Sequence, residues 1–464
     1  MRAILLLAIC LGMSALQAQI QIGSPFVTTN ENEWIGWDMD ISQDGQVIVI
    51  SSIAYPNYDN PDGVVRVFKR NDDGWTQLGE DIVVEEANNS FGFAVSLSGN
   101  GSMLAIGAPS HDSPITGAGA VYLYEITAAD EIVAAGLIEG GSSYQGIGFS
   151  IDLSHEGNTV VVGSQETEYA TVEVYQQQNG NWQLKGNPLA SDVYGDKFGN
   201  AVRMDSTGNL IVVLAPSLGP LTGEMPNVKV FRNSGSAWQI NSDIITSTDF
   251  TTKVQYFELN HSGSLIAANR KSSDYGELEF YTIQDNQLVE GSESITGEVD
   301  FNLNIESNAI SFGEDGQVIA VEGSNKIKVL RYNGSAWTNE YLIEEPGKII
   351  HGLQLAENGR FMIVSFTGTT YSDREVIVYQ LGDLNSVEEK IDPDLEFYPN
   401  PVRSSLFLEL LGFDYEIIEM ETGKVLEVGY ANDREVDVSD LMPGVYILTV
   451  EKEGETTALK FIKQ

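Results

Sequence analysis

The stretch FGFAVSLSGNGSMLAIGAP, residues 91–109, reads as two apolar strands on either side of a polar turn at residues 98–101. Its central part begins at Val95 and has counterparts 56 residues earlier, MDISQDGQVIVISS from Met39, and 56 residues later, IDLSHEGNTVVVGS from Ile151. Aligned on the glycine that closes each turn, the chain contains seven such units, at Gly45, Gly101, Gly157, Gly208, Gly263, Gly316 and Gly359. A repeat of about 50 residues with strand-like content predicts a β-propeller.

Each repeat contains the elements of a four-stranded propeller blade. The run after each turn glycine, such as MLAI from Met103, is apolar on both faces, as expected of a strand covered on both sides. A third strand follows a variable loop, and then come a polar turn and an outer strand. In five repeats the residue three positions before the glycine is Ser, Asp or Asn, which can accept the N–H two residues further on. Four tryptophans of the outer strands are interpreted as packing residues: Trp75, Trp182, Trp238 and Trp337.

The seventh repeat lacks its outer strand. The N-terminal segment IQIGSPF, residues 20–26, resembles the outer strand TQLGEDI of the first repeat, residues 76–82. We therefore expect the N-terminus to complete the last blade and to remove an exposed sheet edge. The predicted fold is all-β, with a seven-bladed β-propeller over residues 19–383.

The second repeat carries a family resemblance. Phe91-Gly92, Gly107-Ala108-Pro109 and the segment GAGAVYLY, residues 117–124, are similar to the FG-GAP repeat of integrin-like propellers. This resemblance implies a seven-bladed propeller used for recognition. The calcium loops of integrins do not carry over, so it does not imply a metal site.

A different unit follows the propeller. A polar linker, residues 384–393, leads to residues 394–464, which contain Tyr398-Pro399-Asn400-Pro401 and Pro443-Gly444-Val445-Tyr446. These motifs resemble the type A C-terminal sorting domain of the type IX (Por) secretion system of Bacteroidetes. The resemblance implies a small C-terminal β-sandwich, with the secretion translocon and its sorting peptidase as partners.

The N-terminus and the charge of the chain agree with export. Residues 1–18 read as a signal peptide, with Arg2 before an apolar run and Ala18 at the cleavage site. We expect Sec export to the periplasm, and then a secreted or outer-surface protein. The only cysteine, Cys10, would be removed with the signal. The net charge of −42 disfavours nucleic acid and anionic membranes as partners.

One set of polar residues recurs five positions before each turn glycine. Apolar neighbours flank each member, so alternation places the polar set on the opposite face of the first strand, which lines the channel of a propeller. The predicted channel-lining residues are Asp40, Ser96, Asp152, Arg203, Glu258, Ser311 and Gln354. Arg203 can bridge Asp152 and Glu258 on the neighbouring blades. The ring is either a polar funnel for a ligand or ion, or a hydrated channel held by ion pairs, and we favour the second interpretation.

Long loops between second and third strands offer another site. Long loops on a rigid scaffold tend to carry recognition. Blades seven, one and two are adjacent around the ring, and we expect a shallow concave site there. The candidate ligand-binding residues are Tyr55, Tyr58, His111, Asp112 and Tyr371.

No motif for catalysis or for a cofactor is found. The sequence lacks the H-x-H, C-x-x-C, G-x-S-x-G and P-loop patterns, and we expect neither a metal nor a cofactor. The favoured function is a non-enzymatic binding or adhesion propeller that recognises an extracellular protein or glycan. Two alternatives stay open: a propeller-hosted enzyme acting on polysaccharide, and a structural surface protein without a discrete ligand.

Overall fold

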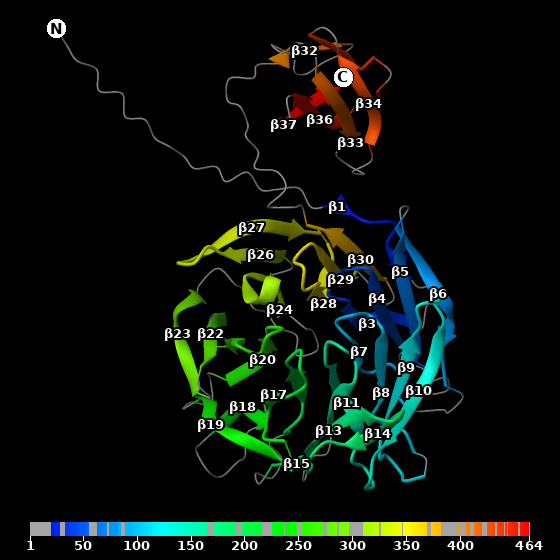
Figure 1. The fold of residues 1–464 in the computed structure, drawn as a ribbon, viewed down its shortest axis with the longest axis vertical. Coiled ribbons are helices and arrows are strands. Elements are labelled where there is room, and N and C mark those ends of the chain that lie inside the picture. The colour runs from blue at the N-terminus through cyan, green and yellow to red at the C-terminus, as the bar shows by residue number, and fades with distance from the viewer. Residues whose placement is uncertain are drawn as a thin grey trace, which may run out of the picture. The chain divides into compact units, whose positions relative to one another are not determined.

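The computed structural model places most of the chain in β-strands (Figure 1). It describes residues 20–27, 33–54, 63–71, 74–84, 89–112, 114–164, 170–191, 197–215, 225–235, 237–247, 253–271, 276–284, 287–296, 310–323, 326–345, 347–368, 373–381, 397–398, 405–408, 413–419, 425–431, 434–439, 441–442, 444–452 and 455–463. The expected signal peptide and linker lie outside these residues. The chain divides into two compact units, one containing residues 22–379 and the other containing residues 380–464 together with residues 19–21.

The first unit is a seven-bladed propeller, as the repeat predicts. The sheets of blades one to three are β3 (Glu33–Ile41), β4 (Val47–Ala54), β5 (Val64–Asn71) and β6 (Gly74–Ile82); β7 (Val95–Leu97), β8 (Met103–Ala108), β9 (Ala120–Ile126) and β10 (Ile132–Glu139); and β11 (Ile147–Leu153), β12 (Thr159–Ser164), β13 (Thr171–Gln178), β14 (Asn181–Leu184) and β15 (Leu189–Ala190). Each sheet is antiparallel, and its strands follow one another in sequence order from the centre to the rim.

The remaining blades repeat this order. They are β16 (Ala201–Met204), β17 (Leu210–Leu214), β18 (Met225–Asn233) and β19 (Trp238–Ser247); β20 (Lys253–Leu259), β21 (Leu265–Lys271), β22 (Gly276–Gln284) and β23 (Gln287–Thr296); β24 (Ile310–Gly313), β25 (Val318–Gly323), β26 (Lys326–Tyr332) and β27 (Trp337–Glu344); and β28 (Ile349–Leu355), β29 (Phe361–Thr367) and β30 (Arg374–Gln380). In blade six a short 3-10 turn, η1 (Glu314–Gly316), joins the first two strands.

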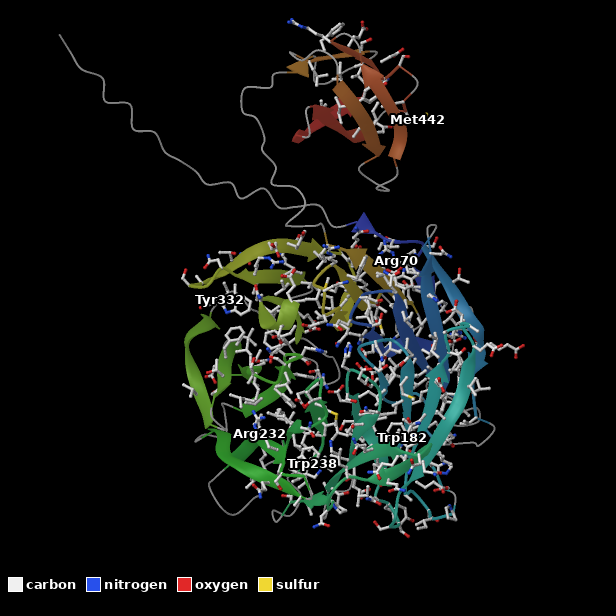
Figure 2. The ribbon with its side chains drawn as sticks, viewed as in Figure 1. Arg70, Trp182, Arg232, Trp238, Tyr332 and Met442 are labelled. Carbon is white, nitrogen blue, oxygen red and sulfur yellow. The ribbon has the colours of Figure 1, made fainter. Side chains whose placement is uncertain are left out.

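The core lies between the blades. All residues of β8, β12, β17 and β29 are buried, because each second strand is covered by a neighbouring blade on both faces. The hydrophobic clusters accordingly combine residues of adjacent blades, such as Val49 and Val67 of blade one with Leu104 and Ile106 of blade two. Four outer-strand tryptophans pack against these clusters, including Trp182 and Trp238, which Figure 2 labels.

The hairpin turns between first and second strands share one construction in blades one to five, whereas blades six and seven carry Gly313 and Ala356 in place of the polar residue. Each closing glycine has a positive φ near 70–90°, a conformation that costs glycine little. The polar residue three positions earlier does accept backbone N–H groups, but not the one expected. Ser42 Oγ accepts the N–H of Val47, five residues on, at 2.9 Å, and Asp205 Oδ1 accepts that of Leu210 at 2.8 Å. The side chain therefore spans the whole turn and fixes the start of the second strand.

A closed belt of hydrogen bonds joins these turns around the ring. Six steps are backbone bonds from one turn to the next: Gln43 to Gly99, Asn100 to His155, His155 to Ser206, Ser206 to His261, Glu314 to Glu357 and Asn358 to Gln43. The seventh step, from blade five to blade six, runs from the Ser262 N–H to Asp315 Oδ1 at 2.9 Å. Because every turn is bonded to both neighbours, the belt fixes the spacing of the blades at this end of the channel. We call it the turn belt.

The N-terminal segment completes blade seven. The strands β1 (Ile20–Gln21) and β2 (Phe26–Val27) both pair with β30, and Phe26 lies opposite Val376. The Ile22 N–H also donates to the Val378 carbonyl at 2.8 Å. Ile22 and Phe26 pack against the hydrophobic cluster shared by blades seven and one. The ring therefore closes at the position where the seventh repeat lacks its outer strand.

The second unit contains two antiparallel sheets. One consists of β31 (Phe397–Tyr398), β32 (Ser405–Leu408) and β35 (Glu435–Asp437), and the other of β33 (Phe413–Glu419), β34 (Val425–Ala431), β36 (Gly444–Lys452) and β37 (Glu455–Lys463). Leu406 and Val436 of the first sheet share one hydrophobic cluster with Ile417 and Leu448 of the second. A shared core is what a β-sandwich requires, and the sandwich itself stays a prediction.

Candidate functional site

A cavity of about 790 Å³ runs along the first strands of the propeller. This volume falls within the range of small-molecule sites. The wall includes all seven residues predicted to line the channel: Asp40, Ser96, Asp152, Arg203, Glu258, Ser311 and Gln354. They come from the innermost strand of each blade. Their side chains face the cavity because alternate side chains of a β-strand point to opposite faces, and the other face of this strand packs in the core.

Four members of this ring hold adjacent blades together. Each accepts the N–H of the residue that follows the ring position of the next blade, so one register is used throughout. The four bonds are Leu97 N to Asp40 Oδ2 (2.7 Å), Leu153 N to Ser96 Oγ (3.1 Å), Met204 N to Asp152 Oδ2 (2.6 Å) and Leu355 N to Ser311 Oγ (2.9 Å). Much of the acceptor capacity of this ring is therefore used within the scaffold.

Arg203 and Glu258 form the ion pair of the ring. Arg203 Nε lies 3.0 and 2.9 Å from the two carboxylate oxygens of Glu258, on the next blade. Asp152, the other carboxylate considered for Arg203, instead accepts the Met204 N–H. Its charge still acts on Arg203, whose pKa is raised by Glu258 and Asp152 against the effect of burial. The positive charge of Arg203 is thus balanced by the carboxylate of Glu258 on the neighbouring blade.

Three other carboxyl groups of the cavity have pKa values raised by burial, although the charge of Arg203 opposes this rise at Asp38 and Asp152. Burial raises the pKa of Asp38 to about 6, of Asp152 to about 7 and of Asp40 to about 8. Backbone N–H donors oppose this effect, and for Asp40 the nearby charges of Asp152 and Asp38 add to it. Shifted carboxyl groups in a cavity mark a candidate functional site, although structural networks shift pKa values too.

Aromatic side chains line the same cavity on blades one to three. Trp37, Phe93 and Phe149 each lie eight positions before the turn glycine and three before the polar ring. The ring centroids of Trp37 and Phe93 are 5.7 Å apart, and those of Phe93 and Phe149 are 4.8 Å apart. Trp37 Nε1 also donates to the Phe93 carbonyl at 3.1 Å. We call these three residues the aromatic arc.

A glycine before each member of the aromatic arc directs its side chain. These glycines, Gly36, Gly92 and Gly148, have φ of +70°, +83° and +86°. The register of β3 with β4 shifts between Ile35 and Met39 at this point. Such bulges re-aim a side chain within a strand. A Cβ on Gly148 would lie 2.5 Å from the Ala120 carbonyl oxygen, so the close packing also requires glycine.

Blades four and seven have polar residues at the position of the aromatic arc, eight residues before the turn glycine. Asn200 of blade four and His351 of blade seven occupy the position of the aromatic arc and line the cavity. Burial, with the nearby Arg374 charge, lowers the pKa of His351 to about 4, so this imidazole is neutral at neutral pH. Lys197, close to Asn200, also lines the cavity and is exposed. The equivalent side chains of blades five and six lie outside the described part of the chain.

The predicted loop site is only partly described. Tyr55, Tyr58 and Tyr371 lie outside the described residues. His111 is buried, and its ring lies edge-on to Tyr122 with centroids 6.0 Å apart. Asp112 Oδ1 accepts the Gly117 N–H of its own loop at 2.7 Å. The structure thus places both described candidates in contacts that hold the loop, and ligand binding by this group stays a prediction.

Sequence reasoning overlooked the aromatic arc, although the alignment contained the signal for it. The dipeptides Gly36-Trp37, Gly92-Phe93, Gly148-Phe149 and Gly199-Asn200 share one offset from the turn glycine. The offset that revealed the polar ring would have revealed them as well. Among the described residues, no group of three or more His, Cys, Asp or Glu side chains is arranged to hold a metal ion.

Two family models match the chain. An FG-GAP repeat matches residues 85–124, and a secretion system C-terminal sorting domain matches residues 396–464. Residues 396–464 are a secretion-system sorting domain. This sorting domain implies interaction with the type IX secretion machinery, and export of the propeller out of the cell or to its outer surface. In the described part of the chain, no helix has the length and hydropathy of a membrane span.

Comparison with solved structures gives distant likenesses. Hydrazine synthase of Kuenenia stuttgartiensis is 13% identical over 76% of this chain and 97% of that chain, with a TM-score of 0.47. The β-propeller domain of Myceliophteria thermophila Cps50 (Swd1) is 9% identical over 79% of this chain and 99% of that chain, also with a TM-score of 0.47. At such values neither likeness carries an argument about function. No curated protein sequence matches the chain.

Proposed function

We propose that the propeller is a non-enzymatic binding module, displayed on the cell surface or released, that recognises an extracellular protein or glycan at its central cavity. The observation that carries this proposal is the aromatic arc. Aromatic side chains with a few polar groups in a concave cavity are the usual lining of a binding site. The ring residues lie three positions after the aromatic arc on the first strands, and four of the seven accept N–H groups of the next blade. The part of the wall formed by the aromatic arc is therefore the part available to a ligand.

Export supports the same proposal. A sorting domain delivers the propeller to the outside, where partners are other surfaces, secreted proteins and polysaccharides. A net charge of −42 keeps such a protein soluble and limits adsorption to anionic surfaces.

An enzyme acting on polysaccharide is the second candidate, because the cavity holds carboxyl groups with raised pKa values. A glycosidase needs one such group as a general acid and a second carboxylate facing the same substrate. Asp40 has the raised pKa, but its two oxygens accept the N–H groups of Ile41 and Leu97. A general acid must carry a proton on one oxygen, and both oxygens of Asp40 already face backbone N–H donors, so we favour binding.

One experiment separates these functions. The mature secreted protein is screened against an array of extracellular glycans and matrix proteins, and in parallel against polysaccharides for release of reducing ends. We expect saturable binding that Trp37→Ala weakens and no release of sugar. Trp182→Ala, on an outer strand, is the matched control and should bind normally. Polysaccharide cleavage that Asp40→Asn abolishes would establish the enzyme instead, and neither binding nor cleavage would favour a structural protein.

A further inference from the structure

We infer that the aromatic arc and the polar groups at its level form a site for a neutral saccharide. This inference rests on the proposed binding function and narrows its ligand from an extracellular protein or glycan to one chemical class. The apolar part of the wall, its polar part and the sign of its charge each indicate this class of ligand.

The apolar part suits the carbon face of a sugar ring. Trp37, Phe93 and Phe149 come from three consecutive blades and form a continuous aromatic wall, with rings tilted by 54° and 34° to one another. All three side chains are partly exposed to the cavity rather than fully buried. A pyranose has faces made of C–H groups that pack against aromatic rings, while its hydroxyls point outward around the edge. A ligand of this shape can cover the arc and still keep its polar groups near polar partners.

The polar part suits those hydroxyls. Asp38 follows Trp37 directly and lines the same cavity. Its two oxygens accept the N–H groups of Met39 and Val95, at 2.9 and 2.7 Å. An ionised carboxylate has about four acceptor positions, so Asp38 retains capacity for hydroxyl donors. Asn200 of blade four lines the same cavity. Its side-chain amide has both a donor and an acceptor, so it can accept a hydrogen bond from a sugar hydroxyl or donate one to it.

The charge of the wall selects among ligands. Five carboxyl groups line the cavity, those of Asp38, Asp40, Asp152, Glu258 and Glu357. The two cations of the wall are Arg203, which is paired with Glu258, and the exposed Lys197. Raised pKa values leave part of this acidic charge protonated at neutral pH, but the described wall offers an anionic sugar no cation other than the paired Arg203 and the exposed Lys197. A wholly apolar ligand would remove water from these carboxyl groups without replacing its hydrogen bonds, which is costly. A neutral, hydroxyl-rich ligand avoids both penalties.

The test uses the full mature protein and three sets of probes: neutral hexose oligosaccharides, uronic-acid oligosaccharides, and lysine- or arginine-rich peptides. Binding is measured by titration calorimetry and by quenching of tryptophan fluorescence. We expect binding of at least one neutral oligosaccharide with a fluorescence change, and weak or no binding of the uronic acids. Trp37→Ala should weaken binding at least tenfold, and Asp38→Asn severalfold. Trp37→Phe keeps an aromatic ring and should bind with little loss but without most of the quenching.

Folding is controlled by melting curves of each variant and by Trp182→Ala, which removes a tryptophan far from the arc. If no neutral oligosaccharide binds, or if one binds equally well to Trp37→Ala and Asp38→Asn, the inference is wrong. Binding of a peptide or protein that depends on Trp37, without saccharide binding, overturns the saccharide while leaving the proposed binding function in place. Cleavage of the oligosaccharides would instead overturn the proposed function.

Discussion

Removing residues 20–27 should destabilise the propeller, because this segment supplies the outer strands of blade seven. Ile22 and Phe26 are partly buried, and full burial of such side chains is worth about 1.5–3 kcal/mol each, so we assign about 1 kcal/mol to each. The backbone bonds to β30, such as that from Ile22 to Val378, add about 1 kcal/mol each. The deletion should therefore cost about 3–4 kcal/mol.

The assay is differential scanning calorimetry of chains that begin at residue 19 or at residue 28. A change of 1 kcal/mol shifts the melting temperature by about 2–4 °C in a domain of 150–250 residues and by less in a larger one. We expect a fall of about 4–5 °C, with aggregation promoted by the free edge of β30. Phe26→Ala should reproduce part of this fall. Val27→Ala is the control, since this side chain is 59% exposed. A melting curve unchanged by the deletion would refute the closure of the ring by this segment.

Three further predictions follow from the cavity and the sorting domain. Arg203→Met leaves Glu258 buried without its partner and should cost up to about 3–5 kcal/mol in chemical denaturation, with partial recovery on adding Glu258→Gln; equal stability of all three forms would contradict this. The raised pKa values of Asp38, Asp40 and Asp152 let the folded protein hold protons that the unfolded chain releases, so its stability should fall as the pH rises from about 5 to 8.5. Asp40→Asn should make this fall smaller. A melting temperature that rises with pH over this range would contradict the raised pKa values. A chain ending at residue 383 should melt as a folded propeller but stay in the periplasm of its native host, and normal export would remove the sorting role.

The blade repeat could be predicted because its turn has fixed chemistry at fixed positions. A glycine with positive φ closes each turn, and in five of the seven turns a polar side chain three residues earlier spans it, so both features are visible in the sequence. The second strands are covered on both sides and appear as continuous apolar runs. These features are local, and a single sequence contains them. The prediction that the polar side chain accepts the N–H two residues on was wrong, since it accepts the N–H five residues on. Which N–H it reaches depends on the backbone conformation of the turn and not on residue type.

The site could be predicted only in part. The alternation of β-strands placed the polar ring, yet the bonds from one blade to the next depend on the angle and spacing between blades, which no local pattern contains. Asp152 therefore binds the Met204 N–H rather than Arg203. The aromatic arc could have been found, since Gly36-Trp37 and Gly92-Phe93 share one offset from the turn glycine. An aromatic residue in a first strand is equally consistent with the core, so the pattern alone does not assign these side chains to the cavity.

The closure of blade seven sets the order in which the ring can be completed. Phe26 pairs with Val376, so the first strand of the propeller to be synthesised meets its partner only after nearly the whole ring has followed it. Contacts of such large sequence separation are slow to form. Until then the edge of β30 is unpaired and blade one lacks its packing against blade seven, so the chain is an open arc of blades. The chain can therefore close as a ring only after its last blade has been synthesised.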